Sequence, residues 1–141
     1  MEKKLICEVI TPEGVVFQGE VDMVVAPGVQ GELGILPLHI SFLTQLAIGE
    51  LRVKFEKEGR AVEDYIAVHG GFMEVFEDRV TVLSPAAELA REIDIERAKS
   101  AKERAEARLR AKKEEGTDVL QAEVASRRAH VRIKTAGRYS G

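Results

Sequence analysis

The sequence predicts an α+β protein in which an N-terminal antiparallel β-sandwich or flattened barrel precedes a C-terminal antiparallel α-helical hairpin. Apolar residues alternate with a period of two through residue 84, and an alanine-rich helical periodicity begins near residue 93. The charge also changes sign between these segments. We therefore expect a β-sandwich domain at 1–84, a linker at 85–92 and a helical hairpin at 93–141.

Short runs of alternating residues fill the first segment, for example at 5–10 and 51–55. Turn residues rich in glycine, proline and acidic side chains separate these runs, as at 12–14, 56–59 and 69–71. Eight or so short strands with such turns are typical of an antiparallel sandwich or a flattened barrel. The glycine-rich stretch at 28–34 lacks the Gly-Lys-Ser/Thr ending of a phosphate loop, so we expect it to let a strand turn sharply.

The second segment has helix start and stop signals. Asp94 is a predicted N-cap, Gly116 is a predicted stop, and Asp118 with Gln121 forms a second predicted capping pair. The second helix is expected to run to about Lys134. The apolar stripe of each helix is rich in alanine, which buries little area, so the hairpin should be only marginally stable alone and able to detach.

Charge separates the two segments. Residues 1–84 hold 7 Lys and Arg against 14 Asp and Glu, a net charge of −7, whereas residues 85–141 hold 14 against 10, a net charge of +4. No carboxylate follows Glu123. The change of sign suggests two modules with different partners.

The composition, 45% hydrophobic and 32% charged, is typical of a globular protein. No apolar run approaches the roughly 20 residues that span a bilayer, and the chain starts on a strand pattern rather than a leader, so we expect membrane association only through a partner. The single cysteine, Cys7, excludes an internal disulfide and suits a reducing cytoplasm.

Catalytic patterns are not found, so we expect no enzyme activity and no metal site. The three histidines, His39, His69 and His130, lack metal-ligand spacing, and Cys7 lies in a strand pattern without a nearby base. An alternative function is a stand-alone β-sandwich whose basic helical arm binds nucleic acid, which salt-dependent DNA or RNA binding would favour. The 5% aromatic content and the acidic overall charge speak against it. A small hydrolase or metal enzyme is disfavoured because its residue constellations are missing.

Three stretches, taken in order, resemble the epsilon-subunit family of bacterial rotary, F-type, proton-translocating ATP synthases. They are 31–39 (GELGILPLH), 65–75 (YIAVHGGFMEV) and 93–98 (IDIERA), the last similar to the motif that opens the family's helical hairpin. The resemblance covers essentially the whole chain. It implies a non-catalytic central-stalk rotor subunit that couples proton flow to ATP synthesis.

The resemblance also implies partners and a location. The β-sandwich would bind the gamma subunit and rest on the c-subunit ring, with Glu32 and His39 facing that ring. The mobile hairpin would enter the alpha/beta catalytic head and inhibit ATP hydrolysis. The protein would lie on the cytoplasmic face of the bacterial cell membrane, held there only through the complex. The implied inhibitory basic face comprises Arg127, Arg128, Arg132, Lys134 and Arg138.

In some bacterial members of this family the folded hairpin binds ATP. The resemblance transfers that site to Glu88, Ile93, Asp94, Arg97, Ala98, Arg104, Arg128 and Arg132. Several guanidinium groups that converge on a polyphosphate would bind it through charge-assisted hydrogen bonds. We therefore expect no required cofactor, with ATP as a regulatory ligand.

Overall fold

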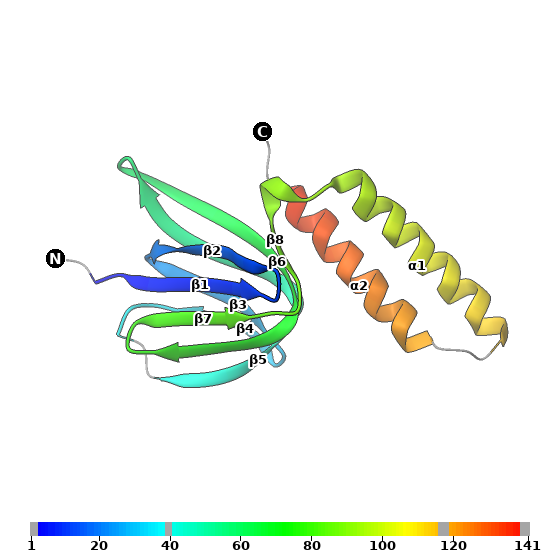
Figure 1. Cartoon of the computed structure of the whole chain (residues 1–141), viewed down its shortest axis with the longest axis horizontal. Coiled ribbons are helices and arrows are strands. Elements are labelled where there is room, and N and C mark those ends of the chain that lie inside the picture. The colour runs from blue at the N-terminus through cyan, green and yellow to red at the C-terminus, as the bar shows by residue number, and fades with distance from the viewer. Residues whose placement is uncertain (1–2, 39–40, 116–118, 139–141) are drawn as a thin grey trace. The chain divides into compact units, whose positions relative to one another are not determined.

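The computed structural model of the protein describes residues 3–38, 41–115 and 119–138, with side chains up to residue 111 in the first helix and from residue 120 in the second. The chain divides into a sheet unit, Met1–Leu89, and a helical unit, Ala90–Gly141 (Figure 1). The predicted hairpin therefore follows a β-sheet domain, as expected.

Eight strands form one hydrogen-bonded sheet in the order β2-β1-β7-β6-β5-β3-β4, with β8 paired to β6. The sheet path ends at β2 and at β4 and does not close into a barrel. The pairs are antiparallel except for β1 and β7, which run parallel. The strands are β1 (Leu5–Thr11), β2 (Gly14–Val21), β3 (Met23–Gly28), β4 (Gly31–Ile35), β5 (Phe42–Lys57), β6 (Arg60–Phe76), β7 (Arg79–Leu83) and β8 (Ala87–Leu89).

The boundary differs from the predicted one because the predicted linker at 85–92 contains regular structure. Its residues form β8 and the 3-10 helix η1 (Ala90–Glu92). Ala87 pairs with Val68 and Leu89 with Ile66, and the Leu89 side chain is buried in the core. The sheet unit consequently extends to Leu89.

A bend in β6 lets this strand pair with different neighbours along its length. Residues before the bend pair with β8, and Phe72–Phe76 pair with β7. Gly70 and Gly71 occupy the bend with φ values of 82° and 111°, in the region that favours glycine. A Cβ on Gly71 would lie 2.0 Å from the Leu83 carbonyl oxygen, so this close approach of backbones also requires glycine.

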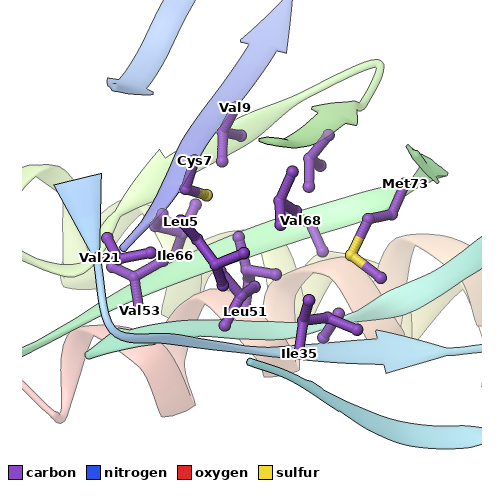
Figure 2. Packing of buried hydrophobic residues seen from close by; sticks show 14 of the residues in the cluster. Leu5, Cys7, Val9, Val21, Ile35, Leu51, Val53, Ile66, Val68 and Met73 are labelled. Carbon is purple, nitrogen blue, oxygen red and sulfur yellow. The ribbon is translucent and has the colours of Figure 1, made fainter. Parts of the chain in front are cut away.

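One hydrophobic core lies within the sheet unit, and all eight strands contribute side chains to it. Leu5, Val21 and Ile66 are fully buried and lie close together there (Figure 2). Cys7 is also buried in this core, and burial raises the pKa of its thiol to about 12. The thiol therefore stays protonated at neutral pH and acts as a small apolar side chain.

The helical unit contains α1 (Ile95–Glu115) and α2 (Val119–Ala136), which pack against each other. Asp94 caps α1 as predicted, because its Oδ1 accepts a hydrogen bond from the Arg97 amide at 3.1 Å. The second helix ends at Ala136, two residues beyond the predicted end. The predicted stop at Gly116 and the capping residue Asp118 lie outside the described residues. Over the part of the chain that is described, neither helix is both long and apolar enough to cross a membrane.

Candidate functional site

The expected nucleotide-binding residues are distributed over both units. Glu88 lies on β8 in the sheet unit, and Ile93 lies between η1 and the Asp94 cap. Arg97, Ala98 and Arg104 belong to α1, whereas Arg128 and Arg132 belong to α2. Ala98 is fully buried, so it could shape such a site through packing but could not present a side chain to solvent.

Buried alanines mark the face that each helix turns toward its partner. On α1 these are Ala98 and Ala105, and on α2 they are Ala122 and Ala129, each pair seven residues apart. Seven residues are about two turns of an α-helix, so each pair lies on one stripe. Small side chains allow the two backbones to approach closely.

The arginines of the two helices lie on the same side of the hairpin. Arg97 and Arg104 each precede a buried alanine by one residue on α1, and Arg128 precedes Ala129 by one residue on α2. Each residue advances about 100° around a helix, and the two helices run antiparallel (Figure 1). Each arginine is therefore rotated by the same angle from the alanine stripe of its own helix. Because the two stripes face each other and the helices are antiparallel, the arginines of α1 and of α2 lie on the same side of the hairpin. Arg97, Arg104 and Arg128 are exposed, and Arg132 is half-buried.

The expected basic face of α2 consists of two stripes. Arg127 and Lys134 are seven residues apart and lie about 140–160° from the Ala129 stripe, so they face away from α1. Arg128 and Arg132 are four residues apart and lie nearer to α1. Arg138 follows the end of the helix. This division separates cations that could contact another subunit from those that could bind a ligand across the hairpin.

Of the residues expected to face the ring, Glu32 lies near the start of β4 with its side chain 64% exposed. A guanidinium nitrogen of Arg52 lies 3.4 Å from the Glu32 carboxylate. Leu36 and Leu38 follow β4 and are both exposed. His39 lies outside the described residues.

Sequence reasoning missed an outer apolar face on the sheet unit. It consists of Leu43 on β5, Phe72 and Phe76 on β6, and Leu83 on β7, whose side chains are each 52–67% exposed. Leu43 pairs with Glu74 and Phe72 with Leu83, so the register places all four on one side of the sheet. The run at 72–76 could have indicated this face, because Phe72 and Phe76 occupy the same outward-facing register as Glu74, while Met73 and Val75 face inward.

Open grooves adjoin this outer apolar face. One is lined by residues 41–43 and 74–76, and another by residues 10–12, 71–72 and 83–85. Both have walls that are mainly apolar. The surface is therefore suited to a partner protein with complementary apolar side chains.

The described side chains provide no assembled metal centre. Among residues 3–38, 41–115 and 119–138, no three His, Cys, Asp or Glu side chains come together in a way that could hold a metal ion. The buried Cys7 thiol is unreactive, as its raised pKa indicates. The surfaces described above can bind partners or ligands, and the chemistry they support is recognition.

Comparison with known proteins identifies the family. Residues 4–90 match the β-sandwich domain of the ATP synthase delta/epsilon chain, and residues 91–137 match the long α-helix domain of the same chain. The chain belongs to the ATP synthase delta/epsilon chain family. The two matched segments meet within one residue of the division between the sheet and helical units.

Relatives and a solved structure agree with this assignment. The chain is 52% identical to the ATP synthase epsilon chain of Halalkalibacterium halodurans over 130 residues, which are 92% of this chain and 95% of that protein. It is 51% identical to the corresponding chain of Desulforamulus reducens over 136 residues, which are 96% of this chain and 99% of that protein. It also resembles a chain in the cryo-EM structure of the Euglena gracilis mitochondrial ATP synthase (OSCP/F1/c-ring). That match has a TM-score of 0.76 and 26% identity, and it covers 99% of this chain and 84% of the other.

The protein is thus a non-catalytic stalk subunit of a rotary ATP synthase, a membrane-associated complex. No finding favours the alternative of a nucleic-acid-binding protein.

Proposed function

We propose that this subunit turns with the central stalk of a bacterial ATP synthase and couples proton flow to ATP synthesis. Its sheet unit would bind the gamma subunit and the c-subunit ring. Its helical unit would regulate ATP hydrolysis by the alpha/beta catalytic head. The protein would lie on the cytoplasmic face of the cell membrane, held there by these contacts.

The observation that carries this proposal is the outer apolar face of Leu43, Phe72, Phe76 and Leu83. Four large apolar side chains that are each more than half exposed on neighbouring strands would be unfavourable in a free monomer. Aromatic residues are enriched at the centres of protein interfaces, and the two phenylalanines lie on the same strand. We propose that gamma covers this face.

The direct test is complex formation between this purified chain and the gamma subunit of the same synthase. Size-exclusion chromatography with light scattering should give a stable equimolar complex. A chain that elutes alone at micromolar concentrations of both proteins would contradict the proposed gamma contact.

Contact with the c-subunit ring would use Glu32 and the segment after β4. This proposal rests on the family assignment and on the exposure of Glu32, Leu36 and Leu38. The ion pair of Glu32 with Arg52 would hold the Glu32 carboxylate in a fixed position for contact with polar loops.

The outward stripe of α2, Arg127 and Lys134, would inhibit ATP hydrolysis by contacting acidic surface on the beta subunits. The variant Arg127→Gln with Lys134→Gln should hydrolyse ATP several-fold faster in the reconstituted complex. Raising the salt concentration should relieve inhibition in the parent complex, because exposed charges are screened over about 10 Å at 0.1 M salt. The hydrolysis rate of the assembled head measures both effects.

A matched control for this prediction is Arg108→Gln with Arg110→Gln, which removes two exposed positive charges from α1. That variant should leave inhibition close to the parent value. Equal hydrolysis rates in the α2 variant and the parent would contradict electrostatic inhibition by this stripe.

ATP binding by the helical hairpin would use the arginines on the side shared by the two helices. A polyphosphate bridging Arg104 on α1 and Arg128 on α2 binds only the paired helices, so it would stabilise the pairing. At about 100 times its dissociation constant such a ligand adds roughly 2.7 kcal/mol, enough to decide the state of a marginal hairpin. We expect millimolar ATP to raise the thermal midpoint of the helical unit.

Arg128→Ala should abolish most of that shift in midpoint, and Arg127→Ala is its matched control. The two variants lose the same charge from adjacent positions on α2, but Arg127 lies on the outward stripe. Calorimetric titration with ATP would give the affinities. The absence of a shift in the parent chain, or equal binding by both variants, would contradict this site. Asp94 is a poorer choice for substitution because it also caps α1.

A further inference from the structure

Asp78 joins three segments at one end of the sheet unit. It lies in the turn between β6 and β7, where Glu77 and Asp78 have φ values of 48° and 60°. Its Oδ1 accepts a hydrogen bond from the Leu38 amide at 2.6 Å, across 40 positions of sequence. Its Oδ2 lies 3.7 Å from the Lys3 ammonium, and its carbonyl accepts a hydrogen bond from the Ile6 amide at 2.9 Å.

Leu38, the residue that Asp78 holds, combines two unfavourable properties. Its φ of 67° lies in the left-handed region, which a branched, non-glycine side chain rarely adopts. Its side chain is 73% exposed, the largest exposed fraction of any large hydrophobic residue in the described part of the chain. A strained and exposed residue that persists because its surroundings fix it is typical of a binding site.

The carboxylate of Asp78 is the group that fixes this conformation. A hydrogen bond to a charged acceptor is stronger than one between neutral groups, and only 23% of the Asp78 side chain is exposed. Without that acceptor, the Leu38 amide would bond to water and the leucine would return to an extended or right-handed backbone. The segment after β4 would then lose its shape while the sheet itself remained intact.

We infer that Asp78 is a positioning residue that presets Leu38 as an apolar contact for the c-subunit ring. This inference rests on the proposed function, which assigns the ring contact to Glu32 and to the residues after β4. Leu38 lies in that segment and follows Leu36 and Pro37. Fixing the segment before binding removes the entropy that a free loop would lose on contact with the ring.

A double-mutant cycle tests this role with the full chain, bound to gamma, and purified c-ring in detergent. Asp78→Gly removes the carboxylate but suits the positive φ of the turn, so the fold should persist. It should weaken ring affinity about tenfold, which corresponds to about 1.4 kcal/mol. In a Leu38→Gly background the same substitution should have little effect, because glycine adopts a left-handed φ without help.

Two matched variants separate positioning from general damage. Glu77→Gly alters the neighbouring residue of the same turn, also at positive φ, and should bind the ring like the parent chain. Asp78→Asn keeps an acceptor oxygen for the Leu38 amide while losing the charge that faces Lys3, so it should retain most of the affinity. The thermal midpoint of the sheet unit should stay close to the parent value in both.

Amide hydrogen exchange of Leu38 is a readout that needs no ring. The amide should be protected in the parent chain and exchange rapidly in Asp78→Gly. Equal ring affinities for Asp78→Gly and the parent, or an unprotected Leu38 amide in the parent, would overturn the positioning role alone. Failure of the parent chain itself to bind the ring would overturn the proposed ring contact and the role of Leu38 with it.

Discussion

Gly71→Ala is expected to destabilise the sheet unit by about 3–4 kcal/mol, the sum of backbone strain and overpacking. Gly71 has a φ of 111°, and an added Cβ would lie 2.0 Å from the Leu83 carbonyl oxygen and 2.9 Å from the Ser84 Cα. Both neighbours are backbone atoms. Leu83 pairs with Phe72 on β6, and the Ser84 amide donates a hydrogen bond to the Ile10 carbonyl, so neither can move without disturbing the sheet. Domains are commonly stable by only about 5–15 kcal/mol, and this loss is a large share of that.

Gly31→Ala is the matched control for this substitution. Gly31 has a similar φ of 128°, but a Cβ there meets no heavy atom within 4 Å. Gly31→Ala should therefore lower the free energy of unfolding only by the backbone strain, about 1–2 kcal/mol. Chemical denaturation of both variants measures the difference. Equal losses of unfolding free energy would show that the close approach of β6 to β7 is not a steric constraint.

Phe72→Asp with Phe76→Asp is expected to weaken binding to gamma by at least about 100-fold. Each substitution replaces an aromatic contact with a carboxylate that would lose its hydration without gaining a partner in an apolar interface. Both side chains are about half exposed in the isolated chain, so the fold should be little affected. Titration of gamma with the parent and variant chains, followed by calorimetry, gives the change in affinity.

Leu120→Asp is a control for the same experiment. Leu120 is 70% exposed, but it belongs to α2 in the helical unit and is not one of the residues of the outer apolar face. It adds a carboxylate at an exposed apolar position without touching the proposed interface. Unchanged gamma affinity in the double phenylalanine variant would mean that gamma binds elsewhere on the chain.

The fold class could be predicted because alternation and helical periodicity are local properties of the sequence. The Asp94 cap was predicted for the same reason. The sequence also suggested a turn at 69–71, where the structure has one long continuous strand, β6. Glycine permits both outcomes, and pairing with distant strands decides between them. At Gly49, a Cβ would lie 2.6 Å from the Pro27 Cβ on the neighbouring strand β3, which a local pattern cannot reveal.

Local sequence patterns also could not predict two features of the sheet, the parallel pairing of β1 with β7 and the short strand β8. In the sequence, most of the sheet unit lies between β1 and β7, so the register of this pair depends on how the intervening strands fold. β8 has only three residues, too few for an alternating pattern to be recognised, and it follows Pro85. Its place in the sheet comes from its pairing with β6 and from the burial of Leu89.

Some features of the candidate sites could likewise be predicted from the sequence, and others could not. The family resemblance supplied Arg97, Arg104, Arg128 and Arg132. Their spacings of seven and four residues then place each pair on a common helix face, because helix geometry is regular. The outer apolar face was not predicted, although Glu74 between Phe72 and Phe76 indicates which positions of this run face outward. The hydrogen bond between Asp78 and Leu38 joins residues 40 positions apart, so only the folded chain brings them together.

The measurement that tests the central claim most directly is affinity purification of the tagged full-length chain from the cells that express it, after mild detergent solubilisation. If the chain is a central-stalk subunit, the gamma, alpha, beta and c subunits should co-purify in fixed ratios, as identified by mass spectrometry, and the complex should hydrolyse ATP. Recovery of the chain without gamma and the c subunits, while the rest of the synthase remains assembled elsewhere in the extract, would contradict the account.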